Sequence, residues 1–311
     1  MPSAYMEIAH VDFAAAIAVF GTPAIVFWGY VAAAVVLVLG LVKILKDEVP
    51  QAHGFDKVMP IGRLCFAIPM AVFGTEHFTI TADIATMVPS WIPAHTFWVY
   101  LVGVGLIAAA LSITVKVQSR LSATLLGVMF CLFVVLMDIP GVVAQPSDRF
   151  TWTLALRELA FANGALAFAG GQMRAKRAGG VPVLVTVARF VIGIAAMFYG
   201  VEHFLHPTLA TGVPLEKIMP EWIPGRLFWA YAAGAVLIAS GACLVANKKT
   251  RQAATYLGVM ILLLVLFEYL PMLIASPKDI VSVNYFFDTL AFGGAVLLLA
   301  DACGVQSTAR S

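Results

Sequence analysis

Long apolar segments alternate with short polar loops along almost the whole chain. A helix that crosses a membrane needs about 20 mainly apolar residues, and nine segments of the sequence fit that description. They are expected at about 22–42, 62–80, 95–115, 122–143, 152–171, 183–204, 226–246, 254–275 and 284–302. The pattern predicts an all-α integral membrane protein with about nine transmembrane helices.

A short motif of polar and aromatic residues occurs twice. A Glu-His-Phe tripeptide is followed by a Pro-x-Trp-Ile-Pro segment and then by a Phe-Trp-x-Tyr segment. These three segments lie at 76–78, 89–93 and 97–100, and again at 202–204, 220–224 and 228–231. The first segment recurs after 126 residues and the other two after 131, so the second copy carries a five-residue insertion. Internal repetition of this kind indicates a duplicated architecture.

Basic residues gather in alternate loops, which sets the expected orientation. These loops, with their flanking helix ends and the tail, contain Lys43, Lys46, Lys57, Arg63, Lys116, Arg120, Arg174, Lys176, Arg177, Arg189, Lys248, Lys249, Arg251 and Arg310. The positive-inside rule then places the N-terminus outside and the C-terminus in the cytoplasm.

The spans divide into one extra N-terminal helix and two repeats of four helices. We expect an N-terminal helix with a cytoplasmic loop at 1–59, a first repeat at 60–173, a cytoplasmic linker at 174–185, and a second repeat with its tail at 186–311. Because each repeat has an even number of spans, the repeats are parallel. They should be related by a pseudo-twofold axis along the membrane normal.

The composition supports a membrane protein and excludes some partners. Hydrophobic residues make up 61% of the chain and charged residues 12%, against about 25% charged in soluble domains. The lipid bilayer is therefore the expected partner. With a net charge of +2 and no basic run, nucleic acid is not expected as a partner. The four cysteines are scattered in apolar surroundings and are expected as buried thiols.

Ionisable residues inside the predicted spans cluster near their outer ends. Such residues are costly in a bilayer and usually face the bundle interior or a cavity. The first repeat is expected to form an outward-facing pocket from Glu76, His77, Asp138, Arg157 and Glu158. The second repeat is expected to form another from Glu202, His203, Glu268 and Asp288. The offset of 131 matches Arg157 with Asp288, so the two pockets are alike in construction and different in chemistry.

Aromatic residues flank both expected pockets. Trp91 and Trp222 lie in the paired-proline segments just outside the spans, where each is either a wedge over the pocket mouth or an interfacial anchor. Tyr100 and Tyr231 begin the next helix. Packing in the interfacial belt is favoured for these tyrosines, although their hydroxyls are placed to reach a pocket.

The repeated Glu-His pair supplies the candidate catalytic residues. Glu76, His77, Glu202 and His203 are groups that can exchange protons with a substrate. Adjacent residues on a helix point about 100° apart, so the two members of a pair should face different neighbours. The alternative is that both pairs hold helices together through buried hydrogen bonds.

Metal and haem sites are conceivable at the histidines but are not expected. His203 and His206 have the i, i+3 spacing that can chelate a metal. The first copy has Ile80 at the matching place, and Pro207 is expected to end the helix. A haem held between His77 and His203 across the pseudo-twofold axis is a further possibility that is not favoured.

At these motifs the chain resembles the DoxX-like family of four-helix bacterial membrane proteins, as a tandem member. The pattern is an arginine that opens the first helix of a repeat, followed by a glycine just before a polar pair, as in Arg63…Gly74-Thr75-Glu76-His77-Phe78 and Arg189…Gly200-Val201-Glu202-His203-Phe204. Named members resemble the membrane subunit of a thiosulfate:quinone oxidoreductase. The resemblance covers about 60–303 and implies the bacterial cytoplasmic (inner) membrane, quinone as a possible cofactor, and a partner subunit in a redox complex.

Three functional hypotheses follow. The first is a quinone-linked redox protein in which the Glu-His pairs exchange protons with quinone oxygens while a partner subunit carries the electrons. The second is a membrane anchor or assembly subunit whose pockets are structural. The third is a transporter, or an enzyme acting on a lipid-like molecule. A transporter usually places its polar groups near the midplane, which counts against that hypothesis.

Overall fold

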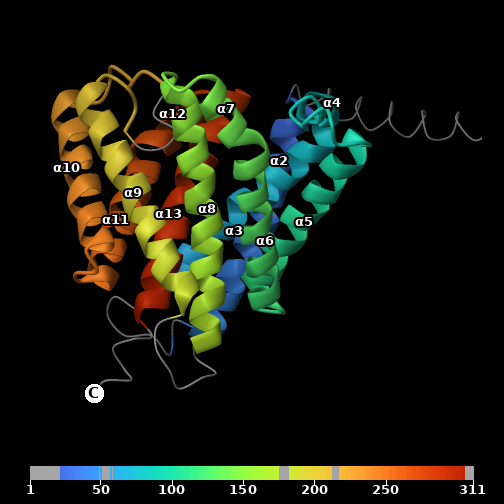
Figure 1. The fold of residues 1–311 in the computed structure, drawn as a ribbon, viewed down its shortest axis with the longest axis horizontal. Coiled ribbons are helices and arrows are strands. Elements are labelled where there is room, and N and C mark those ends of the chain that lie inside the picture. The colour runs from blue at the N-terminus through green and yellow to red at the C-terminus, as the bar shows by residue number, and fades with distance from the viewer. Residues whose placement is uncertain are drawn as a thin grey trace, which may run out of the picture.

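The computed structural model describes residues 22–48, 50, 57, 59–174, 182–211 and 217–304, and these form a bundle of helices (Figure 1). The elements are α2 (Ala24–Lys43), η1 (Ile44–Glu48), α3 (Met59–Thr79), α4 (Thr81–Ala85), α5 (His95–Val115), α6 (Ser119–Phe133), η4 (Val134–Asp138), α7 (Ile139–Ala144), α8 (Arg149–Arg174), α9 (Val183–Leu205), α10 (Arg226–Val245), α11 (Thr250–Leu264), η5 (Val265–Tyr269), α12 (Leu270–Ala275) and α13 (Ile280–Gly304). The η elements are π-helical turns that continue a neighbouring helix. Most of the predicted linker at 174–185 lies outside the described residues.

Seven helical stretches of the described residues are long and apolar enough to cross a membrane. They are Ala24–Glu48, His95–Val115, Ser119–Ala144, Val183–Leu205, Arg226–Val245, Thr250–Ala275 and Ile280–Gly304, and each corresponds to a predicted span. The other two predicted spans correspond to α3 and α8, which have 21 and 26 residues. The prediction of an all-α membrane protein therefore agrees with the structure in its coarse form.

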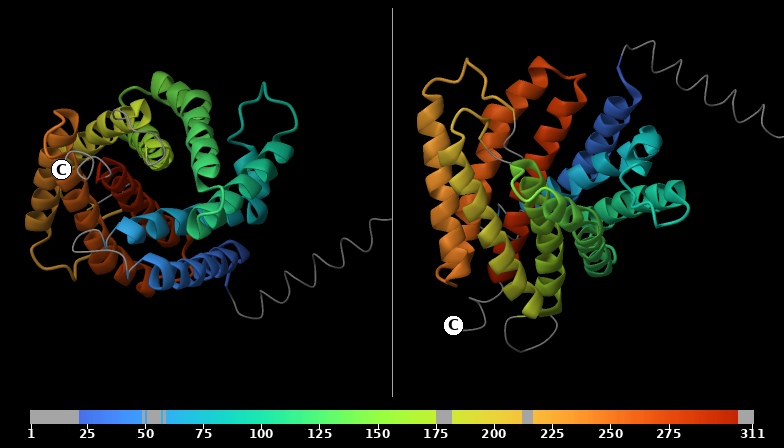
Figure 2. Two further views of the ribbon diagram at one scale, coloured as in Figure 1. Left: turned by 90° about the horizontal axis from the view of Figure 1, so that it is seen from below. Right: turned by 45° about the horizontal axis from the view of Figure 1, so that its top comes forward.

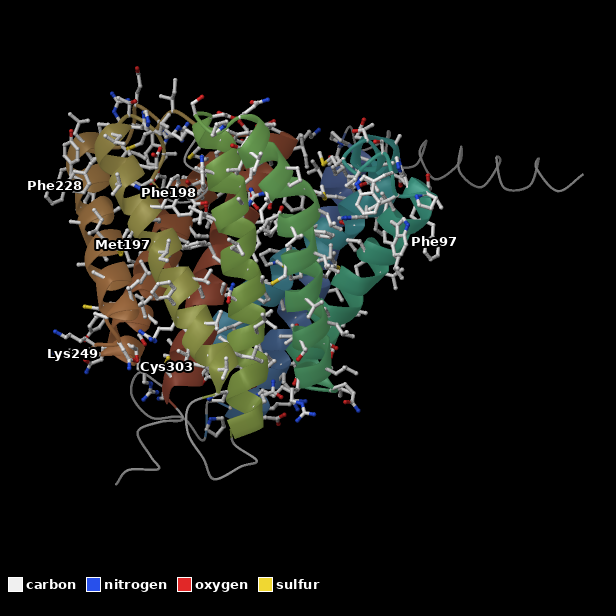
Figure 3. All side chains as sticks on the ribbon, in the orientation of Figure 1. Phe97, Met197, Phe198, Phe228, Lys249 and Cys303 are labelled. Atoms are coloured by element: carbon white, nitrogen blue, oxygen red, sulfur yellow. The ribbon has the colours of Figure 1, made fainter. Side chains whose placement is uncertain are left out.

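Helix bounds in the second half of the chain repeat those in the first. η4 and η5 begin and end 131 residues apart, as do α7 and α12, and α5, α6 and α8 begin 131 residues before α10, α11 and α13. The packing repeats as well, because α3 contacts α5 as α9 contacts α10, and α6 contacts α8 as α11 contacts α13. Phe97 and Phe228, also 131 residues apart, lie on opposite flanks of the bundle (Figure 3).

The two halves interleave. α3 packs against α13, α9 packs against α8, and α8 and α13 pack against each other in the middle of the bundle (Figures 1 and 2). Gly164 of α8 faces Ala295 of α13 so closely that a Cβ on Gly164 would lie 2.5 Å from the Ala295 Cβ. These two residues are themselves 131 apart, so the central helices cross at equivalent positions.

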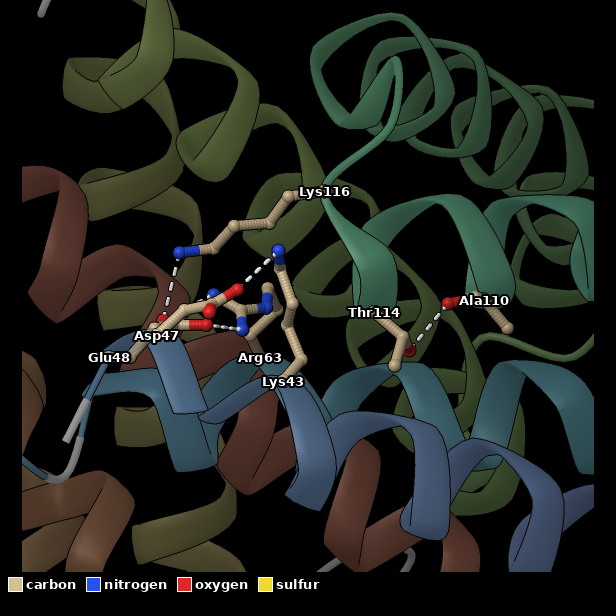
Figure 4. Close-up of polar contacts among 7 residues, drawn as sticks. All are labelled: Lys43, Asp47, Glu48, Arg63, Ala110, Thr114 and Lys116. Atoms are coloured by element: carbon tan, nitrogen blue, oxygen red, sulfur yellow. Dashed lines mark hydrogen bonds and ion pairs between the residues drawn. The ribbon is translucent and has the colours of Figure 1, made fainter. Parts of the chain in front are cut away.

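The extra helix α2 packs along α3, and it also contacts α5. Its C-terminal end is held by Glu48 of η1, which accepts a hydrogen bond from Arg63 Nη1 at 2.9 Å and pairs with Lys116 Nζ at 2.8 Å (Figure 4). Arg189, the counterpart of Arg63, instead donates to the carbonyls of Leu244 and Val245 at the end of α10. The added helix has therefore given Arg63 a partner that Arg189 lacks.

Candidate functional site

The last turns of α3 and α9 position the two Glu-His pairs in the same way. His77 Nδ1 lies 2.7 Å from the Phe73 carbonyl, and His203 Nδ1 lies 2.6 Å from the Tyr199 carbonyl. A carbonyl can only accept, so Nδ1 carries the proton in both rings and Nε2 is the acceptor of the neutral ring. The histidine backbones sit beside glycines of the next helix, since a Cβ on Gly103 would lie 2.8 Å from the His77 Cβ.

Glu76 points away from its histidine, toward α8 of its own repeat and α13 of the other repeat. Its side chain lies within electrostatic reach of Asp288 on α13 and Arg157 on α8. The residue is 9% exposed, and its Oε1 is buried without a hydrogen-bond partner among the described residues. The two members of the pair therefore face different neighbours, as the helical geometry predicts.

Arg157 and Asp288 form an ion pair between the two central helices. Arg157 Nη1 donates to Asp288 Oδ2 at 2.7 Å, and the two side chains are 15% and 10% exposed. The residues occupy equivalent positions in the two repeats, two helical turns before the crossing of α8 and α13 at Gly164 and Ala295. Arg157 lies eight residues inside the start of α8, or about 12 Å along the helix axis, so the pair is well inside the bundle.

A pair of carboxyl groups adjoins this ion pair in the first repeat only. Asp138 ends the π-turn η4 and lies side by side with Glu158 of α8. The counterparts in the second repeat are Tyr269 and Thr289, which are also neighbours and carry hydroxyls in place of carboxyls. Asp138 Oδ2 is buried and has no hydrogen-bond partner among the described residues. The first repeat thus has two acids where the second has two hydroxyls.

The structure gathers five predicted site residues into one group, which we call the central cluster: Glu76, Asp138, Arg157, Glu158 and Asp288. Asp288, expected with the second pocket, forms its ion pair with Arg157 of the first pocket. The interleaving of the repeats brings α13 against α3 and α8, and Asp288 meets Arg157 as a result. Four carboxyls and one guanidinium therefore share a buried region between the two halves.

The remaining acids of the second repeat are engaged elsewhere. Glu202 Oε2 lies 3.6 Å from Arg149 Nε and 3.6 Å from His206 Nε2. Glu268 accepts hydrogen bonds from the backbone N–H of Thr211 at 3.0 Å and from the Thr211 hydroxyl. Glu202 and Glu268, both predicted for the second pocket, therefore make separate contacts.

The histidines of the second repeat do not form a joint ligand set in the structure. His203 is fully buried, whereas the His206 side chain is 44% exposed and paired with Glu202. Among the described residues, no group of three or more His, Cys, Asp or Glu side chains is arranged to hold a metal ion.

The flanking aromatic residues lie on the periphery, away from the central cluster. Trp91 and Trp222 are 72% and 56% exposed. Tyr100 stacks on Phe78 of its own repeat with ring centroids 5.6 Å apart, and Tyr231 makes the equivalent contact. These positions fit a belt of interfacial side chains.

Sequence reasoning missed several residues that shape the site. Tyr199 donates its hydroxyl to the Thr153 carbonyl at 2.5 Å, next to Arg157, and so joins α9 to α8. Trp98 Nε1 donates to the Pro93 carbonyl at 3.0 Å, and Trp229 repeats this bond in the second copy. The signal in the sequence for these tryptophan contacts is the recurrence of the Phe-Trp-x-Tyr segment beside the paired prolines.

Comparisons with known proteins give one match. A family model described as "Domain of unknown function (DUF8561)" matches residues 66–143. The matched stretch contains Glu76, His77 and Asp138 and ends before Arg157. Comparison with curated proteins and with solved structures found no match.

Proposed function

We propose that the protein is a DoxX-like protein of the bacterial inner membrane with nine spans, in which α3 and α8 also cross the bilayer. Two observations support the additional spans. Both helices are long enough, and their charged residues near the bundle centre face other protein helices, which is where intramembrane charges are tolerated. The ends of α5 and α10 and the Lys249 turn lie at the same end of the bundle as the end of α13 (Figures 1 and 3), which supports a cytoplasmic C-terminus.

The central cluster is proposed to exchange protons with a quinone. Four carboxyls around one arginine are too many negative charges for a buried site, so the cluster is suited to holding protons that it can pass on. Reduction of a quinone takes up two protons and two electrons. The cluster residues would supply the protons at the quinone oxygens, and the electrons would come from a partner subunit.

The observation that carries this proposal is the carboxyl group of Glu76. It is buried, has an oxygen without a partner, and lies near the Arg157–Asp288 pair. A buried polar atom without a hydrogen bond is costly, and an oxygen of a bound ligand could remove that cost by pairing with the protonated acid. Glu202, its counterpart, also has an oxygen without a hydrogen bond, but that oxygen lies 3.6 Å from Arg149 Nε, and Glu202 is assigned a supporting role.

The proposal is tested by comparing Glu76→Gln with Glu202→Gln in the complete chain, purified with any partner that it retains. We expect Glu76→Gln to abolish quinone-dependent turnover of the complex and Glu202→Gln to reduce it less. A matched amount of folded protein in both preparations, judged by size-exclusion chromatography, is the control. Full turnover in Glu76→Gln would remove Glu76 from the mechanism.

A second candidate is an anchor subunit in which the cluster only joins the two repeats. The contacts that favour it are those that cross between repeats, namely Arg157 with Asp288, Arg149 with Glu202, and Tyr199 with Thr153. An anchor would copurify with a partner and would keep that association in Glu76→Gln. It would bind no quinone, so extraction of the purified protein with organic solvent would recover none.

A further inference from the structure

The extra helix α2 covers one face of α3. A Cβ on Gly40 of α2 would collide with the side chain of Leu64, and a Cβ on Gly29 would lie 3.2 Å from Val72 Cγ1. Ile68 lies about one turn from each of these α3 residues, and Leu64, Ile68 and Val72 are 6%, 8% and 1% exposed. The close approach of α2 therefore separates this face of α3 from the bilayer.

The same face of α9 has no such cover. The counterparts of the three covered residues, 126 positions later, are Phe190, Ile194 and Phe198, which we call the open face of α9. Phe190 and Ile194 are 48% and 42% exposed, and Phe198 is partly buried. In the described part of the chain, α2 lies outside α3, whereas no helix lies outside α9 (Figure 2, left). One repeat therefore presents to the bilayer a face that the other repeat covers.

The basic residues at the end of the open face lack the carboxylate that α2 supplies in the first repeat. Glu48 accepts hydrogen bonds from both Nη1 and Nη2 of Arg63. The hydrogen bonds of Arg189 both use Nη1, and both go to backbone carbonyls at the end of α10. Lys248 and Lys249 are exposed on the adjoining turn (Figure 3). Among the described residues, none of these last three cations is paired with a carboxylate.

Two features favour a lipid over a helix as the occupant of the open face. Two of its three residues are phenylalanines where α3 has leucine and valine, so a helix backbone cannot come as close to α9 as α2 comes to α3. Acyl chains are flexible and can lie against an uneven aromatic surface. A phosphate also offers two oxygens to a guanidinium, as the Glu48 carboxylate does to Arg63.

We infer that the open face of α9 binds one anionic phospholipid, whose phosphate pairs with Arg189 and whose acyl chains lie against Phe190 and Ile194. Lys248 and Lys249 favour a head group with net negative charge over a zwitterionic one, because basic clusters beside a membrane helix bind anionic lipids. The counterpart face of the first repeat is already occupied by α2. The inference requires only that the helices lie in a membrane, and it is independent of the proposed quinone chemistry.

Native mass spectrometry of the complete chain, released from detergent micelles, tests the head-group preference. The protein is titrated with phosphatidylglycerol and, in parallel, with phosphatidylcholine of identical acyl chains. We expect the first phosphatidylglycerol to bind about tenfold more tightly, as expected for one or two basic residues that act on an anionic head group. Equal affinity for the two lipids would overturn the inference of an anionic site.

Three variants test the residues of the site. Arg189→Gln should lower the affinity for phosphatidylglycerol about tenfold, because charge-assisted hydrogen bonds to the phosphate are lost. Arg120→Gln removes an exposed cation that follows the end of α5, and as the matched control it should change the affinity by less than about twofold. The double variant K248Q/K249Q keeps the contacts of Arg189 with α10, and we expect a loss of about threefold.

The double variant also covers the case in which Arg189→Gln does not fold, judged by size-exclusion chromatography. Unchanged affinity in folded Arg189→Gln would overturn the inference. If that variant does not fold, unchanged affinity in K248Q/K249Q would overturn it instead.

Photocrosslinking tests where the acyl chains lie. Phosphatidylglycerol with a diazirine in one acyl chain is photolysed with the complete chain in nanodiscs, and adducts are located by peptide mass spectrometry. We expect adducts on the open face of α9 and about tenfold fewer on the counterpart residues of α3 beneath α2. Lipid that merely surrounds the bundle would label α9 equally from the matching phosphatidylcholine probe, and that result would overturn the inference. Capture of a polypeptide through a photoreactive residue at position 194 in the native membrane would assign the face to a partner helix and would also overturn it.

Discussion

Replacing Arg157 with glutamine removes the one cation that the described residues place in the central cluster. Four carboxyls would then lie close together in a buried region without a guanidinium. Removing one partner of a buried ion pair costs about 3–5 kcal/mol, and the 2.7 Å contact with Asp288 indicates a well-formed pair. We expect Arg157→Gln to lower the free energy of unfolding by that amount.

Asp288→Asn should be milder, by about 1–2 kcal/mol, because Arg157 would still have Glu158 and Glu76 within electrostatic reach. The double variant should cost little more than Arg157→Gln alone, since the two residues act together. The assay is equilibrium unfolding in mixed micelles at rising SDS fraction. Lys43→Gln, which breaks an exposed ion pair, is the control and should change stability by less than about 1 kcal/mol. Equal and additive effects of the two cluster variants would refute this reasoning.

Four further predictions concern the rest of the bundle. Glu48→Gln should weaken the attachment of α2 by about 1–3 kcal/mol, because two cations lose a carboxylate partner, and faster proteolysis after α2 would report it. Gly200→Ala should cost about 1–3 kcal/mol in the same unfolding assay, because the new Cβ would lie 2.8 Å from the backbone oxygen of Gly234. Gly141→Ala, which meets open space, should be neutral or stabilising by about 0.5–1 kcal/mol. Hydrogen bonding by the Ser282 hydroxyl holds the pKa of Asp279 below its usual value. The ionised carboxylate therefore stabilises the folded protein, by about 0.5 kcal/mol at most for such an exposed group. This stabilisation should be lost as pH falls through the pKa of Asp279, and it should be absent in Asp279→Asn.

The helices and their repetition could be predicted from sequence because hydropathy and spacing are local properties. Seven predicted spans agree with apolar helices of the structure to within a few residues. The offset of 131 also matches Arg157 with Asp288. The offset does not predict that these two residues are in contact, because it relates equivalent positions and contains no information on how the two repeats pack. The sequence alone therefore groups Asp288 with the second pocket and does not reveal its ion pair with Arg157.

The contents of the site were less predictable than its position. A five-residue insertion is visible in the sequence, but its consequence depends on whether the longer loop folds inward, as Thr211 does against Glu268. Tyr199 and Thr211 are ordinary residues of an apolar helix and a loop, and no spacing distinguishes them. Glu76 and Glu202 occupy the same motif in the sequence. Only the packing of α8 against α9 shows that Arg149 pairs with Glu202.

The most direct test of the central claim is infrared difference spectroscopy of the purified protein with bound decylquinone, recorded on electrochemical reduction. If the central cluster passes protons to the quinone, reduction should change the carboxylic C=O stretching region of the spectrum. That change should disappear in Glu76→Gln and persist in Glu202→Gln. An unchanged carboxylic region in the wild-type protein, with the bound quinone shown to be fully reduced, would contradict the account.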